Sequence, residues 1–441
     1  GEKCAGETLN TTVWRGRFMA YPFLFICFPA LAVCFVKFLV PFLNEKRETC
    51  STILIILVVL SAVDTVLLYA RSFPWSDFMG QTRLCAYALR GENPFLLAGN
   101  PTAKIESLGL VPSHFSTTPW GLLLGNLFYH GVPNSLIVFA RVWFLILNFS
   151  SIIFVAYSLL IKLKEKEFHI RFGIPMLAIT SFTFWHALHQ GNAGGIICCL
   201  VILAILWHKE YPILSGVALA FAMVKPQISA LICLSFLLQR KYKTLLIAAA
   251  IDILAWLIVS ILVKTSPAQL VKDFLSVATI ETASNSKGVA SIFSGLFPDA
   301  TILPLSMFLG IVFVVLFHFL LKNRDSVLYI FFPACVASSF WSYAYQNDRF
   351  ILFIPIMLSI FFLFEAQSLK NQILWALSAL CFNVARIGFG TGFITRIFHL
   401  TIEAKRLTEV LTSAYEILLI AISVIILIKL NRNAKNDSPR V

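Results

Sequence analysis

The segment STILIILVVLSAVDTVLLYA, residues 51–70, contains a single charged side chain, Asp64. A helix of about 20 apolar residues is long enough to cross the hydrocarbon core of a bilayer. Similar apolar runs recur along the chain between short polar connections, and the alternation typical of strands is weak. The sequence therefore predicts an all-α polytopic membrane protein, a helical bundle and not a β-barrel.

The composition supports the same class. Hydrophobic residues make up 59% of the chain and charged residues only 13%, with a mean hydropathy of +0.84. A soluble surface needs more charge than this to remain hydrated, which excludes a soluble globular protein. The formal charge of +13 is explained by membrane topology and attraction to anionic headgroups, and we expect no nucleic-acid partner.

We expect about 12 to 13 transmembrane helices in one integral membrane domain, residues 1–441. The candidate spans lie near residues 18–43, 51–70, 135–161, 173–189, 193–207, 212–224, 228–239, 244–263, 301–321, 327–341, 350–365, 372–389 and 408–430. Several of those between Gly173 and Gln239 are short for a full crossing. We expect these to be half-buried or kinked helices that line a cavity.

The distribution of lysine and arginine predicts the orientation, since basic short loops stay in the cytoplasm. The basic connections are residues 44–48, 162–171, 207–210, 239–243, 322–324 and the tail at 429–440. We expect residues 431–441 to form a cytoplasmic tail. The alternate loops then face outward: 71–120 (first large loop), 189–192, 225–227, 264–300 (second large loop) and 343–349. Most of the unusual polar residues lie in these outer loops, so we expect the functional site on the extracytoplasmic face.

The first large outer loop contains a carboxylate just after a span, in Trp75-Ser76-Asp77-Phe78. Residues 77–90 have a partly apolar face beside polar residues, the pattern of an amphipathic helix along the interface. Gly91-Glu92-Asn93-Pro94-Phe95 should end that helix, because glycine and the residue before proline both disfavour helix.

This arrangement resembles glycosyltransferase family 87 of the GT-C superfamily, the polyprenol-phosphate-sugar-dependent mannosyltransferases and their relatives. The family's acidic residue before an aromatic one matches Asp77-Phe78, and its Gly-x-Asn-Pro-aromatic turn matches residues 91–95. Its Gly-Gln-x-Asn step is similar to His189-Gln190-Gly191-Asn192, and its lysine-proline segment is similar to Lys225-Pro226-Gln227. The ordered set covers about residues 51–363 and implies a GT-C helical bundle with amphipathic helices in the first loop.

One departure from the family concerns a histidine. Members often carry Ser-Pro-x-Ser-Trp followed by histidine at an outer helix end, whereas this chain has SSFWSYAYQNDR, residues 338–349. Any role of that histidine falls here to Tyr343, Tyr345, Gln346 or Arg349.

The resemblance and the chemistry together imply a set of roles. A sugar linked to a lipid phosphate is already activated, so the enzyme adds a base for the acceptor hydroxyl, cations for the phosphate, and alignment. We expect Asp77 to be the catalytic base of an inverting transfer, and Lys225, Arg349 and His189 to bind the donor phosphate. The expected substrate-binding residues are Asn93, Gln190, Asn192, Gln227, Tyr343, Tyr345 and Gln346. No metal or other cofactor is expected, because no nucleotide leaves and no Asp-x-Asp motif is present.

Each assignment has a structural alternative. Asp77 could be only the N-cap of the interfacial helix, and Lys225 an ordinary lysine whose charge reaches the interface. His189 could be a satisfied interfacial residue, and residues 347–349 a local cap with a salt bridge. Residues 281–287 are either a solvated loop after a short helix at 268–280, or a segment that closes over the acceptor.

The sequence thus predicts a membrane glycosyltransferase that moves a sugar from a polyprenyl phosphate to a glycolipid or cell-envelope glycan. The resemblance implies a mannose-type hexose, and a pentose such as arabinofuranose is the alternative. The expected location is the extracytoplasmic face of a bacterial cytoplasmic membrane, or the lumenal face of the endoplasmic reticulum. The alternatives are a glycolipid transporter or flippase and a non-catalytic assembly protein. A transporter would favour repeated halves with polar residues at mid-depth, and the chain shows neither pattern.

Overall fold

The fold is taken from a computed structural model of the chain. It describes residues 50, 52–59, 61, 88, 91–99, 134–164, 166–285, 293, 297–321, 327–339, 341, 346–365, 368–385, 417–418, 421, 424–425 and 428.

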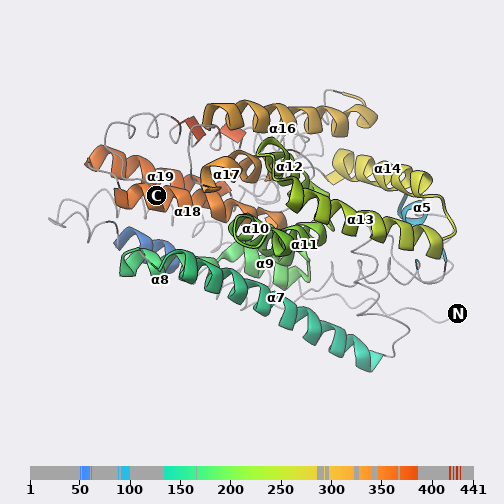
Figure 1. Cartoon of the computed structure of the whole chain (residues 1–441), viewed down its shortest axis with the longest axis horizontal. Coiled ribbons are helices and arrows are strands. Elements are labelled where there is room, and N and C mark those ends of the chain that lie inside the picture. The colour runs from blue at the N-terminus through green and yellow to red at the C-terminus, as the bar shows by residue number, and fades with distance from the viewer. Residues whose placement is uncertain are drawn as a thin grey trace, which may run out of the picture.

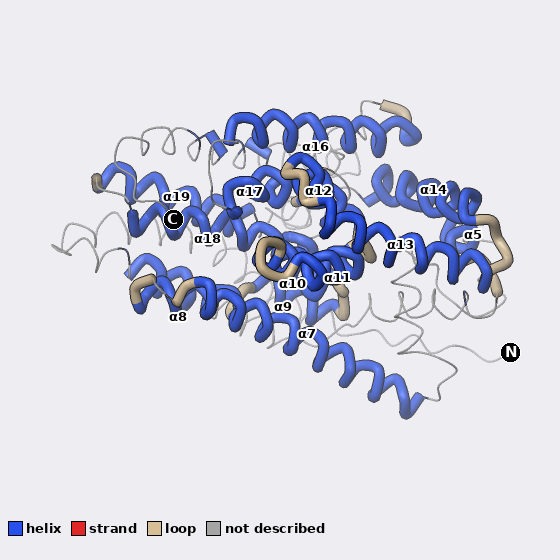
Figure 2. The backbone as a smooth tube through the Cα atoms, viewed as in Figure 1, coloured by secondary structure: helices blue, strands red, loops and turns tan. Residues whose placement is uncertain are grey.

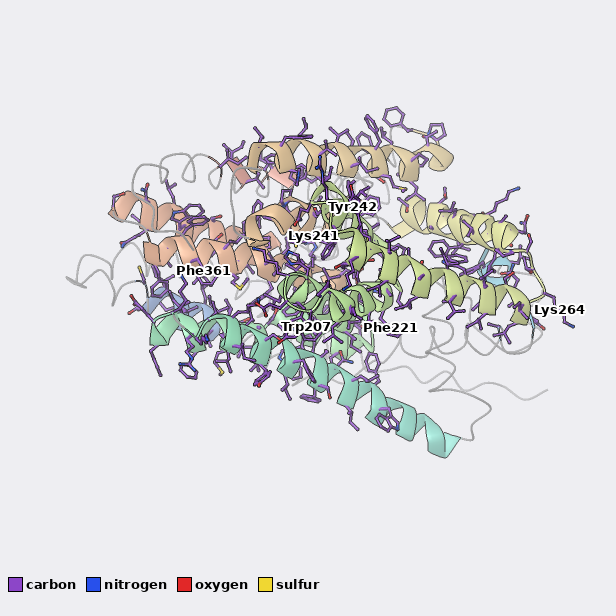
Figure 3. The ribbon with its side chains drawn as sticks, in the orientation of Figure 1. Trp207, Phe221, Lys241, Tyr242, Lys264 and Phe361 are labelled. Atoms are coloured by element: carbon purple, nitrogen blue, oxygen red, sulfur yellow. The ribbon has the colours of Figure 1, made fainter. Side chains whose placement is uncertain are left out.

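Every regular element in these described ranges is a helix (Figure 1). Three helices are long and apolar enough to cross a membrane, over Trp143–Lys162, Tyr242–Leu262 and Thr301–Leu320. They belong to α7 (Asn134–Lys162), α13 (Tyr242–Leu262) and α16 (Asp299–Leu321). Figure 3 labels Tyr242 and Lys264, which mark the two ends of α13. The prediction of an all-α membrane protein is confirmed.

The shorter helices complete the bundle. They are α5 (Pro94–Gly99), α8 (Phe168–Ile179), α9 (Phe182–Gln190), α10 (Gly194–Trp207), α11 (Pro212–Ala222), α12 (Pro226–Leu238), α14 (Pro267–Asn285), α17 (Val327–Ser338), the 3-10 helix η3 (Gln346–Leu352), α18 (Phe353–Glu365) and α19 (Leu369–Ala385). Most of the predicted spans from residue 135 to 389 correspond to one of these helices. The candidate spans 18–43 and 408–430 lie wholly or mostly outside the described residues.

Helix α10 forms the centre of the bundle. Its sequence GGIICCLVILAILW is apolar on every side, so no face of it can be turned to water, and most of its side chains are buried. It contacts α7, α9, α11, α12, α17 and η3, and Figure 2 shows α10 near the middle of the bundle. The short helices between residues 173 and 239 were predicted to be half-buried or kinked; α10 is one of them and is more deeply buried than that. The elements next to residues 189–192, 225–227 and 343–349 therefore pack against one common helix.

Two predictions of local structure were wrong. The span expected at 173–189 is two helices, because α8 ends at Ile179 and α9 begins at Phe182. The Thr180 hydroxyl donates to Met176 O and the Trp185 indole to Ile179 O, which satisfies carbonyls at the end of α8. Glu281 and Asn285 do not lie in a loop, because α14 continues from Pro267 to Asn285.

The connections predicted to be cytoplasmic meet one another. Lys162, at the end of α7, forms an ion pair of 2.5 Å with Glu210, between α10 and α11. Burial lowers the pKa of His208 to about 4, and the charges of Lys241, Lys209 and Lys162 act in the same direction against a hydrogen bond with Ile205 O. Three basic connections thus lie at one end of the bundle, as the orientation by positive charge requires.

Gly216 allows α11 and α13 to pack closely. A Cβ atom at this position would lie 2.8 Å from both Thr244 O and Ile247 Cβ. Backbone cannot move as a side chain can, so we expect Gly216→Ala to separate the helices. The free energy of unfolding should fall by about 1–3 kcal/mol, although alanine favours an isolated helix by up to about 1 kcal/mol. Thermal unfolding in detergent measures the change.

Gly173→Ala is the matched control for this substitution. The three atoms nearest to a Cβ atom there all belong to the side chain of Leu54, which can adjust more readily than backbone. Both variants add one methyl group to a glycine inside a helix. If Gly216→Ala loses no more stability than Gly173→Ala, the close-packing argument is contradicted.

Candidate functional site

The side chain of Lys225 lies at the centre of a buried polar cluster. Lys225 is the N-cap of α12, and Pro226 at the first helical position keeps the lysine backbone out of the helix. Its side chain is only 5% exposed. The ammonium donates to Asn192 Oδ1 and to Asp348 Oδ1, each at 2.7 Å. Lys225 is therefore an internal cation, and it is not a lysine that reaches out to the interface.

Asn192 is supplied by the turn between α9 and α10. Gly191 adopts the left-handed conformation, with φ of 68°, and ends α9. The backbone N–H of Asn192 donates to Ala187 O at 2.8 Å, and its Oδ1 accepts from Gly194 N at 2.8 Å. Asn192 Oδ1 thus caps α10 and binds Lys225 at the same time. The segment 189–192, which was expected at the start of a helix, contains the end of α9 and the residues that lead into α10.

Asp348 supplies the balancing charge from η3. The residue is 0% exposed, and its backbone oxygen accepts from Cys198 Sγ of α10 at 3.2 Å. Its Oδ2 is buried and has no hydrogen-bond partner among the described residues. Burying a carboxylate in this way is possible only beside a cation. We call Asn192, Lys225 and Asp348 the lysine triad; its members come from three separated segments around α10.

Arg349 follows Asp348 directly and is also buried, at 3% exposure. It lines a narrow cavity of about 10 Å³, the volume that the centre of a water molecule can occupy. The polar lining comes from Arg349 with Ser61, Ser181 and Thr183, and the walls are apolar. The hydroxyls of Ser181 and Thr183 lie 3.0 Å apart. Two successive residues of η3 thus have different partners. Asp348 belongs to the lysine triad, and Arg349 lines this cavity.

The first turn of α12 is held by a tryptophan. Trp341 Nε1 donates to Gln227 O at 2.6 Å, and the buried Gln227 is two residues beyond Lys225. A Cβ atom at Gly310 of α16 would lie 2.9 Å from Trp341 Cβ, so the glycine makes room for this residue. The contact ties α12 and α16 to the chain just before η3, and it fixes the position of Lys225 relative to Asp348.

Asn93 belongs to a different polar cluster. It precedes α5, its Oδ1 accepts from Phe95 N at 3.1 Å, and its Nδ2 donates to Asp273 Oδ2 at 2.8 Å. Gln269 donates to the other oxygen of Asp273 at 2.7 Å. Gly91 has φ of 77°, so the predicted turn is confirmed. These hydrogen bonds join the segment before α5 to α14, in the two loops that were predicted to face outward, and none of them involves the lysine triad.

The predicted site residues fall into three groups. Asn192 and Lys225 are brought into contact, and Gln227 and Arg349 lie within two residues of triad members. Gln190 is the last residue of α9, and nothing is described of the side chains of His189 and Gln346. Asp77, Tyr343 and Tyr345 lie outside the described residues.

The sequence interpretation missed Asp348 as a member of the site. It considered Asp348 only within the structural alternative for residues 347–349, a local cap with a salt bridge, but the partner of the carboxylate is Lys225, 123 positions away. A lysine placed inside an apolar chain needs an acidic partner, and this was the available signal. Among the described residues no group of three His, Cys, Asp or Glu side chains could hold a metal ion.

Comparison with known proteins identifies the family. The family model described as glycosyltransferase family 87 matches residues 119–340, half of the chain. The match includes Asn192, Lys225 and Gln227, and it stops before Asp348. No curated protein and no solved structure matches the chain. The all-helical membrane fold agrees with the GT-C superfamily. The chain therefore belongs to glycosyltransferase family 87 and is a membrane glycosyltransferase.

Proposed function

We propose that the protein transfers a sugar from a polyprenyl phosphate to a hydroxyl of a glycolipid or cell-envelope glycan, with inversion at the sugar. The observation that carries this proposal is the buried ammonium of Lys225, held at 2.7 Å by two acceptors beside the buried Arg349. In a sugar transferase, a buried lysine paired with Asp348 and a buried arginine at the next position of η3 are cations that suit a phosphate leaving group.

The charge change in the reaction explains the need for cations. The donor is a phosphodiester with one negative charge. The acceptor oxygen forms a bond to the anomeric carbon, the bond from that carbon to the phosphate oxygen breaks, and the polyprenyl phosphate leaves with two charges. Cations already fixed in a dry site stabilise that added charge without reorganisation. In this proposal Lys225 and Arg349 carry out that role, with His189 as a further donor.

The remaining proton is assigned to Asp77. The acceptor hydroxyl loses its proton as its oxygen attacks, and one carboxylate is sufficient to accept it in a single inverting displacement. A hydrolase would instead show a close pair of carboxylates. In this proposal the base, the outer loops and the lysine triad lie on the extracytoplasmic side, an orientation that the basic connections favour. A mannose-type hexose is the first sugar to test, in a bacterial cytoplasmic membrane.

The donor class is tested with the purified full chain in detergent or nanodiscs. Radiolabelled mannose on a polyprenyl phosphate and the same sugar on a nucleotide are supplied in parallel with a membrane lipid extract as acceptor. We expect product from the lipid-linked donor alone, and competitive inhibition by sugar-free polyprenyl monophosphate. Transfer from the nucleotide donor alone would refute the proposal, and movement of lipid between leaflets without transfer would favour a flippase.

A further inference from the structure

The hydrogen bonds of Lys225 fix the direction of its ammonium. A lysine ammonium has three N–H donors. Two are taken by Asn192 Oδ1 and Asp348 Oδ1, which belong to different segments and lie at 2.7 Å. The third has no partner among the described residues. Because two acceptors determine the rotation about the last bond of the side chain, the third N–H can point in only one direction.

The ion pair is difficult to explain by stability alone. Both side chains are almost fully buried, at 5% for Lys225 and 0% for Asp348. Replacing a buried ion pair by apolar residues of similar volume is often neutral or stabilising, because removing two charges from water costs several kcal/mol for each ion. The surroundings of the pair, α10, α12 and α17, are apolar and would accept such residues. A use for the cation explains the pair better than its contribution to folding.

We propose that Asp348 is a positioning residue, which aims the remaining N–H of Lys225 at the phosphate of the donor lipid. This inference rests on the proposed function. In this proposal Asp348 does not contact the substrate. Its Oδ1 orients the ammonium of Lys225, and its negative charge stabilises that cation inside the bundle. In a 3-10 helix successive side chains leave about 120° apart. The same turn of η3 therefore directs Asp348 to Lys225 and Arg349 to the cavity beside Ser181 and Thr183.

Asp348→Glu separates positioning from charge. The variant keeps the carboxylate that balances Lys225, but it adds one methylene and moves the ammonium by roughly the length of a carbon–carbon bond. A misplacement of about 1 Å can cost about 10²-fold in rate. We expect kcat/KM for the polyprenyl-phosphate donor to fall by about 10- to 100-fold, while KM for the acceptor stays within about twofold.

Inhibition by sugar-free polyprenyl monophosphate tells whether the affected contact is to the phosphate or to the sugar of the donor. Its Ki should rise in Asp348→Glu in the same direction as the donor KM, because the affected contact is to phosphate. If Asp348 contacted the sugar directly, the donor KM would rise and this Ki would not. An unchanged Ki, or donor and acceptor constants that change together, would overturn the inference.

Asp252→Glu provides the matched control. Asp252 is a half-buried carboxylate on α13, and the hydrogen bonds and ion pair found for the lysine triad among the described residues do not involve it. The same extension there should leave the donor KM and the Ki at wild-type values. Both constants are independent of the fraction of folded protein, so they can be measured in native membranes if extraction yields little of either variant. If the wild type itself is not inhibited by the lipid phosphate, the proposed function fails first; if only Asp348→Glu behaves as wild type, the positioning role fails alone.

Discussion

Asp77→Asn should lower the turnover number by about 10²–10⁴-fold, the usual contribution of a general base. The amide cannot take the proton of the acceptor hydroxyl at neutral pH, whereas its size and polarity match those of the carboxylate. The donor should still bind, so the Ki of polyprenyl monophosphate should stay at the wild-type value. Single-turnover transfer from the lipid-linked donor, together with this Ki, measures the two effects separately.

The same substitution also tests the structural alternative for Asp77. Asparagine is as good an N-cap as aspartate, so a residue that only caps the interfacial helix would tolerate the change with turnover intact. Asp64→Asn, which removes the carboxylate inside this span, is the control and should retain activity. Wild-type turnover in Asp77→Asn would end the assignment of the base.

The helices of this protein could be predicted because apolar length alone determines most of them. The span expected at 244–263 is α13 at Tyr242–Leu262, and that at 301–321 is α16 at Asp299–Leu321. The break between α8 and α9 could not be predicted in the same way. It lies inside one apolar run, and it depends on side-chain hydrogen bonds of Thr180 and Trp185 to the end of α8.

The candidate site was predictable only in part. Asn192 and Lys225 could be found because each lies beside a residue that marks a helix boundary, Gly191 before the asparagine and Pro226 after the lysine. The pairing with Asp348 depends on how η3 packs against α10, which local sequence does not encode. The burial of Lys225 was likewise not predictable, since a lysine at a helix end is more often at the interface. Charge balance in an apolar bundle is the physical rule that joins the three residues.

Lys225→Gln should lower the free energy of unfolding by about 3–5 kcal/mol, since it leaves Asp348 as an uncompensated charge in the bundle. Asp348 is 0% exposed and its Oδ2 already has no partner among the described residues, so no rearrangement of the side chain alone brings it to water. Thermal or denaturant unfolding of the full chain in one detergent, compared with wild type, measures the loss. Donor-dependent transfer should be lost as well, because the phosphate then lacks a cation.

The neutral pair Lys225→Gln with Asp348→Asn separates these two consequences. Both charges are removed, and the amides can hydrogen-bond to each other and to Asn192, so most of the lost stability should return. Transfer should stay low, because no rearrangement of amides replaces an ammonium beside a phosphate that leaves with two charges. Recovery of stability without activity assigns the cation to the reaction. Recovery of both would show that the ion pair serves the fold alone, and it would remove Lys225 from the donor site.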